Sequence, residues 1–66
     1  MEKGWINIRN FNKTYLAEIA KEVLTDNNIK SVIINKKDSS YNSFGDIELY
    51  VRKEDKEQAL TLIKDL

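Results

Sequence analysis

Cysteine, histidine and proline are absent from this chain of 66 residues, and glycine occurs only as Gly4 and Gly45. Without cysteine there is no disulfide and no thiolate metal site, and without histidine there is no imidazole ligand. The same absences remove the usual nucleophile–base pairs of enzymes. Two isolated glycines cannot form a glycine-rich phosphate loop. The sequence therefore predicts no catalytic residue, no metal and no cofactor, and it indicates a protein that works by binding.

An excess of charge of one sign is also absent, since eleven basic residues balance eleven acidic ones. Proteins that bind nucleic acid through phosphate contacts usually carry a basic excess, so no nucleic-acid partner is predicted. No apolar run approaches the roughly 20 residues that span a bilayer, so no membrane partner is predicted. The first residues, 1–4, lack the apolar stretch of a signal peptide, and a cytoplasmic location is expected by default.

The length of the chain allows one domain, residues 1–66, with one small core. A domain of this size buries only about 60% of the surface of its unfolded chain. Its core rarely supplies more than roughly 3–5 kcal/mol, and no disulfide or metal adds to that. Association is then the remaining way to bury more apolar surface, so a homo-oligomer or a complex with a protein partner is expected.

Apolar residues that alternate with polar ones predict three strands. The first is Trp5–Arg9, closed by Phe11. The second is Ile29–Lys36, where three consecutive β-branched residues favour extended structure. The third is Ile47–Val51, which has the clearest alternation in the chain.

Apolar residues at three- and four-residue spacing predict two helices. The first begins at about Lys13, with Asn12 as its N-cap. We expect it to end with Asn28 in the left-handed conformation and with Leu24 contacting Ile29, as in a Schellman motif. Its apolar stripe contains Tyr15, Leu16, Ile19, Ala20, Val23 and Leu24. The second helix begins at Glu54, and its stripe contains Ala59, Leu60, Ile63 and Leu66, with Leu62 at the edge.

The order β-α-β-β-α predicts an α+β fold of the split β-α-β type, a ferredoxin-like half. A right-handed crossover makes the first two strands parallel, and the third strand then lies between them. The strand order is 1-3-2, and both helices cover one face of the sheet. The first strand is an edge, where free backbone groups invite pairing with another chain.

The face of the sheet away from the helices is where a partner is expected. Alternation directs Ile6, Ile8, Ile47, Leu49 and Val51 to the helices. It leaves Trp5, Asn7, Arg9, Glu48, Tyr50 and either Ile33 or the pair Val32 and Ile34 for the other face. We predict that Trp5, Ile33 and Tyr50 bind a partner there, because a contiguous apolar patch usually marks an interface. The alternative is that stems of lysine and arginine cover these side chains locally.

The polar segment from Lys37 to Gly45 is long for a hairpin connection, and long loops often carry function. Lys36, Lys37, Tyr41 and Phe44 could hold an anionic or planar ligand. The alternative is a loop without a site, whose Phe44 packs against the sheet edge. Oxygen donors from Asp38 resemble the start of a calcium loop, but the required glycine and closing glutamate are missing.

Several segments together resemble a known family: residues 17–24, Ile29, residues 45–51, Asp55 and Ala59. They are similar to a small bacterial domain of unknown function that is labelled a signal-transducing protein and grouped with the PII (GlnB-like) ferredoxin folds. The resemblance covers almost the whole chain. It implies a β-α-β-β-α fold, self-association and a regulatory role. It does not imply ATP binding, because PII proteins use a much longer loop between the second and third strands.

The sequence therefore predicts a non-enzymatic binding or regulatory module of unknown partner. We expect it to associate with itself through the open sheet face or the edge strand. The alternative is a domain that senses a small effector through the loop between the second and third strands.

Overall fold

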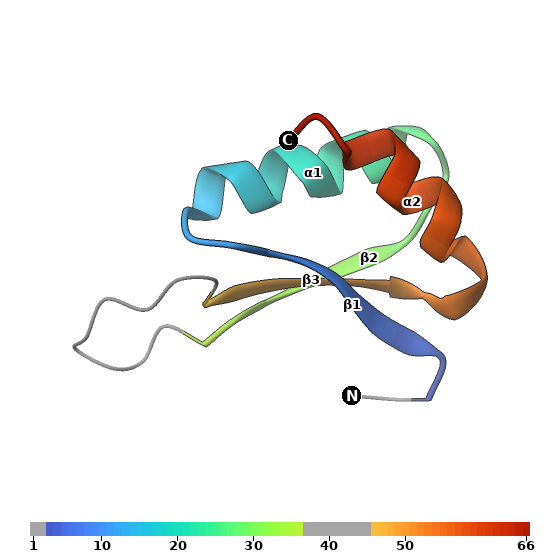
Figure 1. The fold of residues 1–66 in the computed structure, drawn as a ribbon, viewed down its shortest axis with the longest axis horizontal. Coiled ribbons are helices and arrows are strands. Elements are labelled where there is room, and N and C mark those ends of the chain that lie inside the picture. The colour runs from blue at the N-terminus through green and yellow to red at the C-terminus, as the bar shows by residue number, and fades with distance from the viewer. Residues whose placement is uncertain (1–2, 37–45) are drawn as a thin grey trace.

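A computed structural model describes residues 3–36 and 46–66 and contains the predicted strands and helices in the predicted order (Figure 1). The elements are β1 (Trp5–Phe11), α1 (Thr14–Asp26), β2 (Ser31–Asn35), β3 (Ile47–Arg52), the short 3-10 helix η1 (Lys53–Asp55) and α2 (Lys56–Ile63). Strand β3 pairs antiparallel with both neighbours, so the sheet order is β1-β3-β2. Both helices lie on one side of the sheet (Figure 1), which confirms the predicted α+β architecture.

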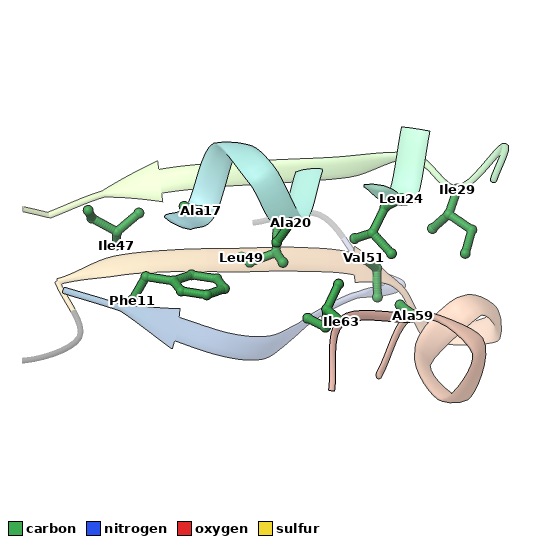
Figure 2. Close-up of a cluster of buried hydrophobic side chains, with 10 residues drawn as sticks. All are labelled: Phe11, Ala17, Ala20, Leu24, Ile29, Ile47, Leu49, Val51, Ala59 and Ile63. Carbon is green, nitrogen blue, oxygen red and sulfur yellow. The ribbon is translucent and has the colours of Figure 1, made fainter. Parts of the chain in front are cut away.

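The core lies between the sheet and the two helices (Figure 2). Ile47, Leu49 and Val51 of β3 are buried, as their alternation predicts. The helices contribute several alanines, whose small side chains let a helix pack close to the strands. The buried residues are Phe11, Ala17, Ala20, Leu24, Ile29, Ile47, Leu49, Val51, Ala59 and Ile63. Ile6 and Ile8 of β1 pack against this cluster, on the side predicted for them.

The end of α1 has the predicted geometry. Asn28 has φ +63°, the left-handed conformation that asparagine tolerates better than most residues. The backbone N–H of Ile29 donates to the carbonyl oxygen of Leu24 at 2.9 Å, and that of Asn28 donates to Thr25 at 3.0 Å. These are the two hydrogen bonds of a Schellman motif. The buried side chains of Leu24 and Ile29 are its hydrophobic pair.

The start of α1 differs from the prediction. The residue that precedes the first helical position is Lys13, in an extended conformation, and no side chain caps the helix. The prediction of Asn12 as N-cap is therefore wrong by one position. The buried face of α1 is also rotated toward Ala17 relative to the predicted face. Tyr15 and Ile19, which were predicted to lie in the apolar stripe, are therefore 59% and 42% exposed.

The second helical segment is split. Glu54 and Asp55 belong to η1, and α2 begins only at Lys56. Because α2 ends at Ile63, Leu66 lies beyond the helix and is 38% exposed, in contrast to the predicted stripe. Ala59 and Ile63 are buried as predicted, and Leu62 packs against the core.

Strand β1 contains a bulge that changes which side chains face the helices. Its register with β3 shifts between Asn7 and Arg9, so Ile8 is an extra residue. A bulge places two residues opposite one residue of the partner strand and reverses the alternation beyond it. Arg9 consequently pairs with Leu49, and Phe11 with Ile47, on the side of the helices. The prediction that Arg9 lies on the open face is wrong for this reason.

Arg9 uses this position to hold the end of α2 and the residues that follow it. Its guanidinium donates to the carbonyl oxygen of Leu66 at 3.0 Å and to that of Ile63 at 3.2 Å. The last carbonyl groups of a helix lack intrahelical partners and carry partial negative charge, so a cation is favourable there. The guanidinium also lies 5.7 Å from the ring centroid of Phe11. Arg9 thus links β1 to the C-terminal end of α2.

Candidate binding face of the sheet

The open face is the side of the sheet away from the helices (Figure 1). Cross-strand pairing assigns its members, because residues directly opposite each other share a face. Tyr50 pairs with Asn7 on one side and with Val32 on the other. Among the paired residues that the structure describes, this face holds Trp5, Asn7, Asn10, Val32, Ile34, Glu48, Tyr50 and Arg52. The predicted placement of Trp5, Asn7, Glu48 and Tyr50 on this face is confirmed.

The register of β2 settles which of its β-branched residues point away from the helices. Ile33 pairs with Leu49 and packs against the core, so it lies on the helix side. Val32 and Ile34 pair with Tyr50 and Glu48 and lie on the open face. The predicted placement of Ile33 on the open face is therefore wrong, and the alternative, the pair Val32 and Ile34, is correct. A role for Trp5 and Tyr50 in binding a partner stays a prediction.

The apolar members of the open face are Trp5, Val32, Ile34 and Tyr50, and each is half-buried. Val32, Ile34 and Tyr50 lie on the neighbouring strands β2 and β3, so they form a continuous apolar strip. At Trp5 the alternative of local cover holds, because the Arg52 guanidinium lies 5.3 Å from the centroid of the indole ring. Such a stacked arginine shields an aromatic face while its own charge stays in water.

A polar network borders the strip. The hydroxyl of Tyr50 donates to Oε1 of Glu48 at 2.9 Å, and Nζ of Lys36 lies 3.6 Å from the same oxygen. The hydrogen bond to Glu48 raises the pKa of Tyr50 above its usual value of 10.0. Partial burial and the negative charge of Glu48 raise this pKa further. The network holds the Tyr50 ring in place on the open face.

Asn7 has a structural role that the sequence did not indicate. Its side-chain Nδ2 donates to the carbonyl oxygens of Arg9, at 3.2 Å, and of Leu49, at 3.1 Å. These bonds span the bulge, where the regular ladder between β1 and β3 is interrupted. One signal could have revealed the bulge: Ile6 and Ile8 share one phase of the strand, but Phe11 has the opposite phase and is also apolar.

Of the residues predicted to bind a ligand, only Lys36 belongs to the described part of the chain. Its side chain is 63% exposed and pairs with Glu48. Its backbone N–H donates to the backbone carbonyl oxygen of Asp46 at 2.9 Å, which extends the β2–β3 ladder by one residue. Lys37, Tyr41 and Phe44 lie outside the described residues, and so does the calcium-like segment.

The described residues, 3–36 and 46–66, also bear on metal binding and on membrane spanning. Within these ranges there is no group of three or more acidic side chains positioned to hold a metal ion. No helix in the same ranges is both long enough and apolar enough to cross a membrane.

Comparison with known proteins gives one match. No curated protein and no solved structure matches the chain. Residues 5–66, from the first residue of β1 onward, match the family model described as "Putative prokaryotic signal transducing protein" (DUF2007). Because that match covers nearly the whole chain, the protein belongs to this family of small domains.

Proposed function

We propose that this protein is a non-enzymatic binding module that forms a homodimer through the open face of its sheet. The observation that carries this proposal is the strip of Val32, Ile34 and Tyr50, which neither α1 nor α2 covers. Strands with apolar residues on both sides are typical of sheets that are buried on both sides. Here the helices bury one side, and a second copy would bury the other.

The charges of the open face suit a second copy. A two-fold interface brings the same surface of both copies together, so this surface must complement itself. The face carries Glu48 together with Arg52, and Lys36 borders it. Because both signs are present, rotation about a two-fold axis can place the carboxylate of one copy near a cation of the other. A face of one sign would instead repel its copy.

The size of the face predicts a weak dimer. Three strands about 4.8 Å apart, with roughly six residues rising about 3.3 Å each, span about 14 Å by 20 Å. Even with the relief of the side chains, this is less than the roughly 800 Å² that each partner contributes to a standard interface. We therefore expect reversible association that depends on protein concentration. The family resemblance described above also implies self-association and a regulatory role.

Sedimentation of the purified protein over a wide concentration range tests the proposal. We expect a monomer–dimer equilibrium, with Trp5 emission shifting to shorter wavelength as the dimer forms. Val32→Lys and Ile34→Lys place charge in the strip and should each give a monomer that remains folded. The control is Ile19→Lys, which alters an exposed apolar residue on the opposite side of the molecule. A protein that stays monomeric at millimolar concentration, with unchanged Trp5 emission, rules the dimer out.

A further inference from the structure

Tyr15 and Ile19 are the exposed apolar residues of α1, and they lie on the side of the molecule opposite the open face. Both belong to the apolar pattern of the helix, but the core uses Ala17, Ala20 and Leu24 instead. Single exposed apolar residues are common on protein surfaces. These two differ because they are four residues apart, so they are neighbours on the helix surface.

Together with two carboxylates they line a shallow hollow of about 310 Å³. Its lining residues are Tyr15, Glu18, Ile19 and Glu22. This volume is at the lower limit of small-molecule pockets, roughly 300–1,000 Å³, which enclose most of their ligand. Here all four residues come from one helix, so the hollow is open to the side and cannot enclose a small molecule.

The spacing of the lining residues identifies a different occupant. Positions 15, 18, 19 and 22 are i, i+3, i+4 and i+7, the four corners of one diamond on a helix surface. When two helices pack, such a diamond is the hole that receives one side chain of the facing helix. The hollow therefore has the form that accepts an apolar side chain of a second helix, and α2 packs on another side of α1.

The charge at the hollow specifies the partner further. Glu18 and Glu22 form no ion pair with any residue in the described part of the chain. Lys21 is the one basic residue of α1, and it does not line the hollow. Carboxylates repel nucleic acid and anionic lipid, whereas they attract lysine and arginine. A partner helix could place a leucine in the hollow and basic residues beside it. It would then bury the apolar side chains and pair with the carboxylates.

We propose that the outer face of α1 is a docking site for a cationic amphipathic helix of another protein. The apolar side chain enters between Tyr15 and Ile19, and basic side chains pair with Glu18 and Glu22. This site is separate from the open face and does not rest on the proposed dimer. A molecule with both surfaces would join to its copy on one side and hold a partner on the other.

A synthetic amphipathic helix of leucine and lysine tests the proposal, with a peptide in which glutamate replaces every lysine as its counterpart. We expect the lysine peptide to shift the NMR amide signals of α1 around Tyr15, Ile19 and Glu22, with affinity that falls as salt is added. The glutamate peptide should not bind. Trp5, the only tryptophan of the chain, lies on the open face, so its emission should not change during this titration.

Matched variants locate the contact. Ile19→Gln removes the apolar contact at an exposed position and keeps good helix propensity, so it should weaken binding about tenfold. Glu22→Gln should weaken binding and reduce its salt dependence, whereas Glu57→Gln, an exposed carboxylate of α2, should not. The proposal is overturned if Ile19→Gln binds as the parent does, if Glu57→Gln has the effect of Glu22→Gln, or if the peptide changes Trp5 emission instead of the α1 signals.

Discussion

The side-chain amide of Asn7 donates a hydrogen bond to the backbone carbonyl oxygen of Leu49 at 3.1 Å, across the point where β1 bulges away from β3. The same amide also donates to Arg9, so one side chain replaces the ladder bonds that the bulge removes. This contact stabilises the bulge. The bulge in turn places Arg9 and Phe11 on the side of the helices.

Asn7→Ala should lower the free energy of unfolding by about 1 kcal/mol, because two carbonyl groups lose their donor in a partly exposed place. Urea unfolding followed by Trp5 emission measures this loss. Asn10→Ala is the matched control, since Asn10 is an exposed asparagine of the same strand and the same face. An equal loss for both variants would mean that Asn7 does not stabilise the bulge.

Arg9 should stabilise the fold through the planar shape of its guanidinium and not through its charge alone. Arg9→Met removes the bond to Ile63 at the end of α2 and the bond to Leu66 beyond it, and should cost about 1–2 kcal/mol. Arg9→Lys keeps the charge but loses the planar fork that reaches two carbonyl oxygens, so it should restore only part of the loss. Thermal unfolding of the three proteins provides the comparison. If Lys restores the full stability, the interaction is a simple charge effect at the helix end.

The alternation of apolar and polar residues was sufficient to predict the architecture. It was not sufficient to predict which face of the sheet each strand residue occupies. In β3 only one phase is aliphatic, so Leu49 and its neighbours could be placed from the pattern alone. In β2 three consecutive residues are apolar, and the pattern cannot distinguish Ile33 from Val32 and Ile34. Pairing with β3 makes that choice. In β1 the bulge reverses the alternation, which is why the pattern predicts the wrong side for Arg9.

In α1, too, some features follow from the local sequence and others depend on tertiary packing. Asn28 was predictable because the left-handed conformation is a local property of a few residue types. The rotation of α1 about its own axis was not predictable from the sequence, since it depends on how closely Ala17 and Ala20 approach the sheet. Tyr15 and Ile19 became exposed as a result.

Asn28→Gly should raise the free energy of unfolding slightly, because glycine adopts φ +63° without a penalty from Cβ. Asn28→Ala should lower it by about 1 kcal/mol, because alanine tolerates this conformation poorly. Asn27→Ala is the control at the preceding position, where φ is −107°. It should cost less than Asn28→Ala, although it removes the bond from Asn27 Nδ2 to the carbonyl oxygen of Val23. Urea midpoints of the three variants rank these effects, and a stabilising Asn28→Ala would contradict the assigned conformation.

Tyr50 gives the protein a predictable response to alkaline pH. Its pKa in the folded state is raised, first by its hydrogen bond to Glu48, so the folded protein holds the phenolic proton more tightly than the unfolded chain. The stability from this interaction is complete below the unfolded pKa of about 10 and is lost as pH rises through the higher folded value. Ultraviolet titration of tyrosinate in a Tyr15→Phe, Tyr41→Phe background isolates Tyr50. We expect a midpoint above 10, and Glu48→Gln should lower it, whereas Glu54→Gln on η1 should not. A midpoint that Glu48→Gln leaves unchanged would mean that this carboxylate does not hold the Tyr50 hydroxyl on the open face.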